Sequence, residues 1–410
     1  MLIKNLKGLL AVATLGLVAG CSTPCAPGGL CAPVQANTSA SPVASPAPAF
    51  PGTQPAAPAV RTSPVEAPPA ARQDTGPVTR IGLLLPLSSP ILGQAAESVR
   101  AGFMAGYERD RAGFAVNVVP TGDAPQEALD AYTRAVANND IVVGPLARSA
   151  VAAVATGAAV TKPTVALNDP QLGRALPHQM LVIGLSIEDE ARQVADWAAA
   201  EHPNGRAWVL TGASAWQRRT ADAFSARWRQ LGYDSNIIEI PVTDGYVDGN
   251  FLADLRARLD SDAPDLMFAA LDASALRQVR SSLGTSLPAY GASSVNPGLA
   301  PEQVAPELNG VRVLDLPWQV QPNHPAVMVY PRPVGAQSLD MERLYALGID
   351  AFRVVREITL QPGRPFELDG VTGKLRVEAA APGNGGPRFH RIEARAIYQD
   401  GSFQPSEPVY

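Results

Sequence analysis

Runs of β-branched and leucine side chains alternate with amphipathic segments from about residue 79 onward. Five runs predict the strands of a first unit: Ile81–Leu85, Ala115–Val119, Ile141–Val143, Thr164–Leu167 and Met180–Leu185. Between the first two runs, Val99, Phe103 and Tyr107 recur at the spacing of one helical face. Strand runs that alternate with such helices are typical of a parallel sheet in an α/β fold.

A second set of strands and helices of the same kind follows. Residues 186–189, Ser-Ile-Glu-Asp, have the capping-box pattern of a helix start. Strands are then predicted at Arg206–Leu210, Ser235–Val242, Leu266–Leu271, Pro288–Tyr290 and Val311–Leu316. Gly232 and Gly284 fit the position that follows the last turn of a helix. The two consecutive sets predict two doubly wound α/β lobes with parallel sheets.

The last part of the chain predicts a return between these lobes. After a proline-rich crossing at Pro317–Pro333, apolar residues at helical spacing predict a long helix capped by Ser338. Beyond it, Leu375 and Val377 alternate with charged residues, which indicates β-strands. We therefore expect a first lobe over 79–185, a second lobe over 186–316, a return crossing and helix to the first lobe over 317–360, and closing strands on the second lobe over 361–410.

The amino-terminal residues 1–20 have the features of a secretory signal peptide. Two lysines precede an apolar stretch, Leu9–Val18, that is too short to span a bilayer. The stretch ends Leu-Val-Ala-Gly-Cys21, which resembles a bacterial lipobox and implies cleavage before Cys21 and its acylation. An ordinary signal peptide that precedes a cysteine by chance is the alternative. Ser22 follows the cysteine, which by analogy with bacterial lipoproteins favours the outer membrane, with the body facing the periplasm.

Residues 21–78 are predicted to be a disordered tether behind the acylated cysteine. Proline, alanine, serine, threonine and glycine dominate this segment, which holds 13 of the chain's 39 prolines. Such a composition buries too little apolar surface to offset the entropy lost on ordering. Cys25 and Cys31 lie in the tether, where they could pair with each other or between chains in an oxidising compartment. The fold should not need them.

Charge and hydropathy narrow the classes of partner. The net charge is -5, nearly all cations are arginines, and no basic stripe carries interleaved aromatic residues. This pattern argues against nucleic acid as a partner. No segment beyond the signal peptide approaches 18 apolar residues, so membrane attachment falls to the acyl chains on Cys21.

No pattern of catalytic or metal-binding residues stands out. The four histidines have neither metal-ligand spacing nor neighbouring cysteines. The segment Gly212-Ala-Ser-Ala-Trp216 lacks the closing glycine of a nucleophile elbow, and no phosphate-binding glycine motif follows a strand. We therefore predict a protein that is not an enzyme and has no metal and no cofactor.

Small polar residues follow several of the predicted strands, at the edge where α/β sheets bind ligands. They are Ser88, Ser89, Ser149, Asn168 and Asp169 in the first lobe, and Thr211, Ser214, Asp272 and Ser293 in the second. Hydroxyls and free helix N–H groups in such loops suit a carboxylate or another small polar ligand. The alternative is that these residues cap helices around a cleft that is shut or empty.

Two further groups of residues leave alternatives open. Arg148 and Asp169 could clamp a ligand or form an ion pair at the rim of the cleft, and we favour the ion pair. Trp216-Gln-Arg-Arg219 places cations at a helix start, where they oppose the helix dipole. We interpret Trp216 as a core or rim residue, and Arg218 and Arg219 as a candidate protein-contact patch.

Several segments are similar to those of a known family. Two α/β lobes with a recrossing chain resemble a type I periplasmic binding protein. The segments IGLLLPLSS, DIVVGPLARSAVAAVA, PTVALN, YGASSVN, and RLYALGIDAFR followed by FELDGVTGKL together resemble the LppC/LpoA family of outer-membrane lipoproteins. That resemblance covers about Arg80 to Gln404 and implies an activator of bifunctional class A penicillin-binding proteins, which synthesise peptidoglycan. Full-length family members carry a helical-repeat domain between lipid and body, and a Pro/Ala tether stands in its place here.

Two functions from different classes fit these features. The first is an outer-membrane-anchored activator whose body binds a class A penicillin-binding protein and stabilises its active conformation. The second is a lipoprotein receptor whose lobes close on an amino-acid-like solute for an ABC uptake system. A spacer without a specific partner is a third interpretation. We favour the activator, because a long tether to the outer membrane suits an importer poorly.

Overall fold

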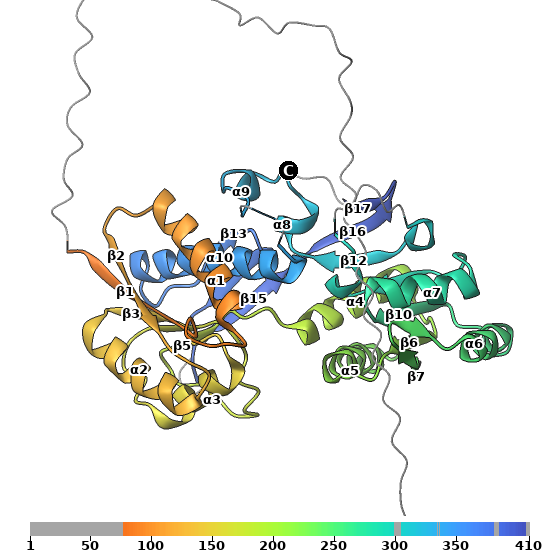
Figure 1. Ribbon diagram of the computed structural model, residues 1–410, viewed down its shortest axis with the longest axis horizontal. Helices are drawn as coiled ribbons and strands as arrows, with labels where there is room; N and C mark the ends of the chain where they lie inside the picture. Colours follow the sequence, from red (N-terminus) through yellow and green to blue (C-terminus); the bar gives the residue numbers. More distant parts are fainter. Residues whose placement is uncertain (1–76, 299–304, 334, 336, 381–384, 407–410) are drawn as a thin grey trace, which may run out of the picture. The chain divides into compact units, whose positions relative to one another are not determined.

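The computed structural model describes residues 77–298, 305–333, 335, 337–380 and 385–406 (Figure 1). All of them belong to the compact unit Ala71–Tyr410. The predicted signal peptide and nearly all of the predicted tether, with Cys21, Cys25 and Cys31, lie outside the described residues. Within the described part of the chain, no helix is long and apolar enough to cross a membrane.

A five-stranded parallel sheet in the order β2-β1-β3-β4-β5 forms the first lobe (Figure 1). Its strands are β1 (Thr79–Leu85), β2 (Phe114–Pro120), β3 (Ile141–Val143), β4 (Thr164–Ala166) and β5 (Met180–Val182). Side chains of a strand alternate between the two faces, so Leu83 and Leu84 enter different core clusters. The covering helices are α1 (Gly93–Arg109) and α10 (Leu339–Leu360) on one face, and α2 (Pro125–Asn138) and α3 (Arg148–Gly157) on the other.

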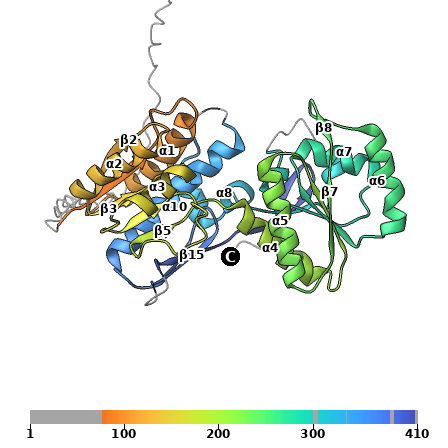
Figure 2. The same cartoon turned by 90° about the horizontal axis from the view of Figure 1, so that it is seen from below.

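A seven-stranded sheet in the order β17-β16-β12-β11-β10-β6-β7 forms the second lobe (Figure 1), and Figure 2 shows α5 and α6 on opposite sides of β7. Its parallel strands are β6 (Ala207–Thr211), β7 (Ser235–Glu239), β10 (Leu266–Ala270), β11 (Ala289–Gly291) and β12 (Arg312–Asp315). Two antiparallel strands, β16 (Ala394–Gln399) and β17 (Ser402–Pro405), extend it beside β12. The covering helices are α4 (Ile187–Glu201) and α5 (Ala215–Gln230) on one face, and α6 (Gly249–Asp262) and α7 (Ala273–Leu283) on the other.

The predicted α/β fold with two doubly wound lobes is confirmed, with one local difference in the second lobe. The run Ser235–Val242 is not one strand, because β7 ends at Glu239. Residues Val242–Thr243 instead form β8, which pairs with β9 (Tyr246–Val247) in a short hairpin. The hairpin turn is Asp-Gly, and both of its residues have positive φ, as the tight turns of two-residue hairpins require.

The helix starts and stops predicted from capping residues are present. The hydroxyls of Ser186 and Ser338 accept hydrogen bonds from the backbone N–H groups of Asp189 and Met341, at the starts of α4 and α10. Gly284 ends α7 with a φ of 84°. Short helices that the sequence did not predict are η1 (Ser293–Val295), η2 (Pro306–Leu308), α8 (Pro317–Val320) and α9 (Pro325–Met328).

The end of the chain differs from the expectation that residues 361–410 all close onto the second lobe. Strands β13 (Phe366–Asp369), β14 (Lys374–Glu378) and β15 (Arg388–Ile392) form a separate antiparallel sheet. The alternating residues Leu375 and Val377 are buried in the core of the first lobe, beside α1 and α10. Only β16 and β17 join the second lobe, because the chain crosses between the lobes once more at Glu393.

Helix α10 belongs to the first lobe because it packs unusually close to α1. A Cβ atom on Gly102 would lie 1.8 Å from the carbonyl oxygen of Tyr345, and one on Gly348 would lie 2.1 Å from that of Val99. Nearby, the rings of Phe103 and Phe352 meet edge to face with centroids 5.5 Å apart. The first turn of α10 is thereby fixed relative to the first-lobe sheet.

Replacing Gly102 with alanine tests this close approach. Helix propensity alone predicts a gain of about 1 kcal/mol for glycine to alanine inside a helix. The clash with a backbone carbonyl should reverse the sign and lower the free energy of unfolding by about 2–4 kcal/mol, as overpacking does. The measurement is urea denaturation followed by circular dichroism.

Gly93→Ala is the matched control, because a Cβ atom there would lie 3.5 Å from the nearest backbone oxygen. It should be neutral or slightly stabilising. Equal stability changes for the two variants would contradict the close packing of α1 against α10.

Candidate binding site between the lobes

A pocket of about 660 Å³ lies where the chain passes between the lobes. Its lining comes from the start of α4, the start of α5, the segment around η1, the end of β12, the first turn of α10, and Glu393 between β15 and β16. The three crossings of the chain follow β5, follow β12, and fall at Glu393. Each crossing therefore contributes to the wall of this one pocket.

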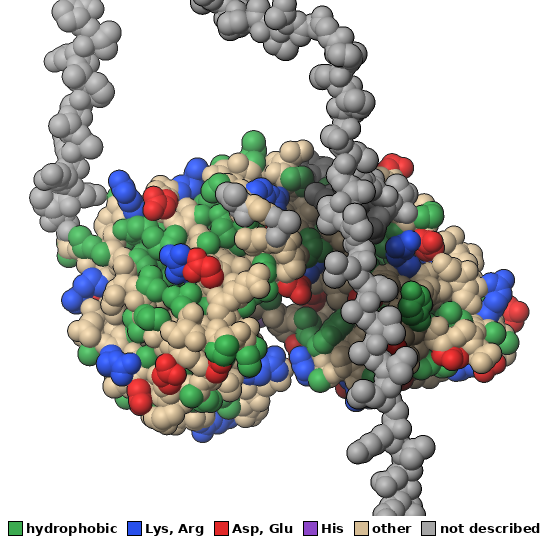
Figure 3. All heavy atoms as spheres, viewed as in Figure 1, with side chains coloured by type: hydrophobic (Ala, Val, Ile, Leu, Met, Phe, Trp, Pro, Cys, Tyr) green, Lys and Arg blue, Asp and Glu red, His purple; other side chains and the backbone are tan. Residues whose placement is uncertain are grey.

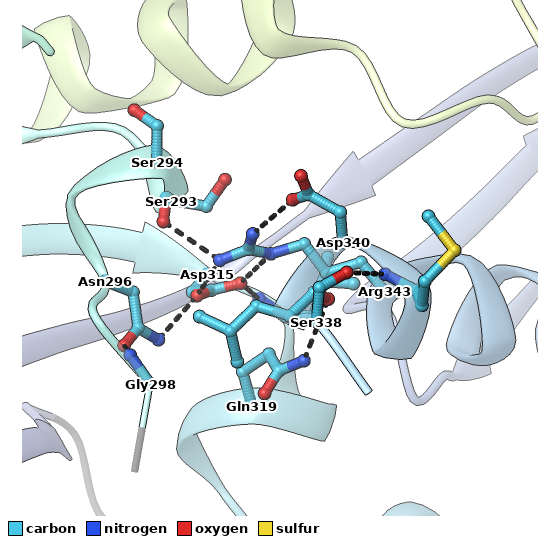
Figure 4. A network of polar contacts seen from close by, with 12 residues as sticks. Ser293, Ser294, Asn296, Gly298, Asp315, Gln319, Ser338, Asp340 and Arg343 are labelled. Atoms are coloured by element: carbon cyan, nitrogen blue, oxygen red, sulfur yellow. Dashed lines mark hydrogen bonds and ion pairs between the residues drawn. The ribbon is translucent and has the colours of Figure 1, made fainter. Parts of the chain in front are cut away.

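Arg343 in the first turn of α10 connects the two lobes through an ion pair (Figure 4). Its Nη2 donates to Asp315 Oδ2 at 2.8 Å, and its Nε donates to Asp315 Oδ1 at 3.2 Å. Its other bonds go to the Asp340 carboxylate at 3.0 Å and the Ser293 carbonyl at 2.9 Å. Asp315 ends β12 of the second lobe, whereas α10 is packed into the first. The ion pair therefore bridges the lobes.

Asp315 is fully buried and its carboxylate is saturated with hydrogen bonds. Besides Arg343, it accepts from the Asn296 side-chain amide at 2.9 Å and from the Leu316 backbone N–H at 2.8 Å. Such a carboxylate is stable only while its cation is present, because loss of one partner leaves an uncompensated buried charge.

Two further carboxylates, Glu190 and Glu393, lie buried at the other crossings. Glu190 in the first turn of α4 accepts from the Ser293 backbone N–H and from the Ser293 hydroxyl, the latter at 3.0 Å. Glu393 is 9 % exposed, and its Oε2 has no hydrogen-bond partner among the described residues. Burial raises the pKa of Glu393 to about 7. Burial, with the nearby Glu393 charge, raises the pKa of Glu190 well above its usual range.

Only two of the polar residues proposed from the sequence, Asp272 and Ser293, line this pocket. Asn168 and Asp169 line a separate pocket of about 290 Å³ beside the start of α4. Most of the candidates make local bonds instead. Asp272 and Ser214 cap α7 and α5, and Ser89 binds Asp123 and two N–H groups of its own loop.

The remaining candidates also lack a shared site. Thr211 is buried and donates to the Gly212 carbonyl, whereas Ser88 and Ser149 are exposed. Arg148 donates to the Gln171 side chain and forms no ion pair with Asp169 among the described residues. Local capping, the alternative that the sequence left open, thus accounts for much of this set.

The arginines proposed as a protein-contact patch are both paired. Arg218 forms an ion pair with Glu239 at 3.3 Å, and Arg219 forms one with Glu188 at 2.9 Å. Trp216 is half-buried and lines the pocket between the lobes, which agrees with its interpretation as a rim residue. The two cations are thus held by carboxylates of the same lobe.

The sequence did not single out Glu190, Asp315, Arg343 or Glu393. Asp315 offered one signal, since a carboxylate inside the apolar run 311–316 needs a partner when the run is buried. The partner, Arg343, is 28 residues away on a helix that carries several other charged residues, one of which, Asp350, is also buried. Its position in the fold, and not its sequence neighbours, makes it a bridge.

Comparison with known proteins places these features in a family. The family model described as "LppC putative lipoprotein" matches residues 50–382. The penicillin-binding protein activator LpoA of Pasteurella multocida is 27% identical over 316 residues, which is 73% of this chain and 51% of that protein. The LpoA of Histophilus somni strain 129Pt is 28% identical over 345 residues, or 80% of this chain and 54% of that protein. The chain spans about half the length of the curated relatives it matches.

Among solved structures of the same architecture, some are named LpoA and others are named as components of amino acid transporters. Full-length LpoA from Haemophilus influenzae is 25% identical with a TM-score of 0.65, over 81% of this chain and 59% of that chain. The LpoA C-domain from the same organism, described as a regulator of PBP1A, shares the fold with a TM-score of 0.64 at 24% identity, over 80% of this chain and all of that one. A Chromobacterium violaceum protein described as a "putative branched-chain amino acid ABC transporter" is 31% identical with a TM-score of 0.64, over 78% of this chain and all of that one.

A double-mutant cycle tests the bridge between the lobes. Arg343→Met should lower the free energy of unfolding by about 3–5 kcal/mol, because it leaves the buried Asp315 charge unpaired. Adding Asp315→Leu should recover part of that loss, which gives a coupling energy of about 2 kcal/mol or more. The exposed pair Glu97 and Arg100 on α1 is the control, with an expected coupling of about 0.2–1 kcal/mol. Equal couplings for the two pairs would contradict a buried bridge.

The pH dependence of stability tests the burial of Glu393. Its folded pKa of about 7 lies above the unfolded value of about 4.3, so between these limits the folded state binds more protons. Its contribution to the free energy of unfolding is therefore largest below about pH 4 and is lost as the pH rises to about 7. The free energy of unfolding of the wild type, minus that of Glu393→Gln, should fall by on the order of 3 kcal/mol between pH 5 and pH 8. A difference that stays constant across this range would show that the carboxylate is solvated.

Proposed function

The chain belongs to the LppC lipoprotein family, and we propose on this basis that it activates a class A penicillin-binding protein from the outer membrane. In this proposal Cys21 carries the lipid and residues 21–78 form the tether. The two-lobed body then recognises the peptidoglycan synthase in the periplasm. The observation that carries the proposal is that the family match and the alignments to curated LpoA activators extend over the body.

In this proposal the body regulates the reaction of its partner and does not catalyse one itself. Two of the titratable groups at the crossings are bonded within the site: Arg343 pairs with Asp315, and Glu190 accepts from Ser293. No group of three or more metal-ligating side chains occurs among the described residues. An activator of this kind must bind the active conformation of its partner more tightly than the inactive one.

A receptor for an amino-acid-like solute is the second candidate, favoured by the pocket and by the name of the Chromobacterium violaceum protein. The lining of the pocket argues against it. Arg343 is the one cation in that lining, and its N–H groups already bind Asp315, Asp340 and Ser293. A carboxylate on a solute would have to displace Asp340 or Asp315 to reach it, and displacing Asp315 would break a buried ion pair.

The surface offers candidate contact points for the synthase. Arginine and carboxylate side chains are interspersed on the face drawn in Figure 3, so charge does not mark a binding patch there. Single exposed apolar side chains are common on protein surfaces, so we use the largest of them as probe positions and not as a defined patch. Ile91, Tyr246 and Met328 are such residues, with exposures of 82, 74 and 67 %.

A reconstituted synthesis reaction tests the proposed function. The purified full chain is added to a class A penicillin-binding protein of the same bacterium with its lipid-linked substrate, and glycan polymerisation and peptide cross-linking are measured. We expect one of the two rates to rise about threefold or more, which requires a preference for the active state of only about 0.7 kcal/mol.

Photo-cross-linking in cells identifies the contact. A photoreactive residue at position 91, 246 or 328 should capture the synthase from at least one position, whereas the exposed control position Glu367 should not. Unchanged rates together with no capture from any of the three positions would refute the activator role. Stabilisation of the chain by branched-chain amino acids would then favour the receptor.

A further inference from the structure

The pocket between the lobes has a strongly acidic lining. Among the described residues, four carboxylates line it together with a single guanidinium: those of Glu190, Asp272, Asp340 and Glu393, and that of Arg343. The guanidinium is committed to Asp315, Asp340 and the Ser293 carbonyl. The lining therefore favours a cation and disfavours an anion.

One oxygen of this lining is buried and has no partner. Glu393 is nine-tenths buried, and its Oε2 makes no hydrogen bond with any described residue. Buried carboxylate oxygens in native proteins are normally satisfied, so an unsatisfied one beside a pocket calls for an explanation. The oxygen itself is closed to solvent, so a ligand donor reaches it only when the Glu393 carboxylate turns toward the pocket.

The rest of the wall suits an organic cation with an apolar body. Leucine and isoleucine side chains from the start of α4, the end of β12 and the start of α10 face the same space. The half-buried Trp216 adds an aromatic ring, a favourable neighbour for a cation. The volume of about 660 Å³ lies within the range of small-molecule sites and exceeds what a single lysine side chain would fill.

We propose that this pocket binds a small molecule that carries a primary ammonium group on an apolar body and has no carboxylate, with Glu393 and Glu190 as the acceptors of the ammonium group. The site is separate from the proposed activation of a synthase and does not depend on it. It also differs from a site for a zwitterionic amino acid, because the lining holds no cation free to pair with a ligand carboxylate.

The charges around Glu393 lead us to expect that binding of an ammonium group releases a proton. Burial raises its pKa to about 7, Arg391 of β15 and Arg343 of α10 oppose the shift, and Asp315 of β12 and Asp189 of α4 add to it. Glu190 of α4 faces the same cluster, and burial raises its pKa as well. Near pH 6.5 the pair therefore holds at least one proton. A bound ammonium group would replace that proton, which leaves the carboxyl group and enters solvent.

Isothermal titration calorimetry of the full chain tests the proposal, with n-hexylamine and 1,5-diaminopentane as probes. At pH 6.5, titrations in two buffers of different ionisation enthalpy measure the protons released. We expect at least one amine to bind with release of about one proton, and 6-aminohexanoate, a zwitterion of similar length, to bind at least about tenfold more weakly. Glu393→Gln should weaken amine binding about tenfold or more and reduce the proton release.

Glu367→Gln is the matched control, because Glu367 is an exposed carboxylate on β13 outside the pocket. It should bind the amines as the wild type does. Glu190→Gln provides a second pocket variant if Glu393→Gln fails to fold, and it should also weaken binding. The proposal is overturned if neither amine binds at millimolar concentration, if the zwitterion binds equally well, or if a folded pocket variant binds like the wild type. None of these outcomes bears on the activation assay.

Discussion

The ion pair between Arg343 and Asp315 is the interaction on which the arrangement of the two lobes depends. Arg343 stands on α10, which glycine contacts hold against α1 of the first lobe. Asp315 ends a central strand of the second lobe and is fully buried. Removing the cation from a buried carboxylate is strongly destabilising, because it leaves an uncompensated charge in apolar surroundings. The relative position of the lobes is thus coupled to whether a single guanidinium stays in place.

The same crossings also concentrate negative charge. Each of the three passes of the chain between the lobes carries one buried carboxylate, and these are Glu190, Asp315 and Glu393. Arg343 satisfies Asp315, and burial leaves the other two with raised pKa values. Carboxylates therefore outnumber cations among the described residues that line the pocket, and the guanidinium there is already paired.

Sequence pattern predicted the two lobes because their strands are buried on both faces and read as apolar runs with helical segments between them. It misplaced β13–β15, since alternation shows that Leu375 and Val377 share a face but not which core receives that face. It also named small polar residues in strand-end loops, and two of them, Ser214 and Asp272, are helix caps in the structure. The carboxylates and the guanidinium at the crossings come from distant parts of the chain. Only the tertiary fold brings them together, so the spacing of these residues in the sequence does not show that they are neighbours.

The distance between the lobes in solution tests the central claim most directly. Spin labels at the exposed positions 149 in the first lobe and 257 in the second, with the three native cysteines replaced by serine, report that distance by double electron–electron resonance. The wild-type chain should give one narrow distribution, and Arg343→Met should broaden or displace it while both lobes remain folded. Identical distributions in the two proteins would contradict the claim that the Arg343–Asp315 ion pair sets the arrangement of the lobes.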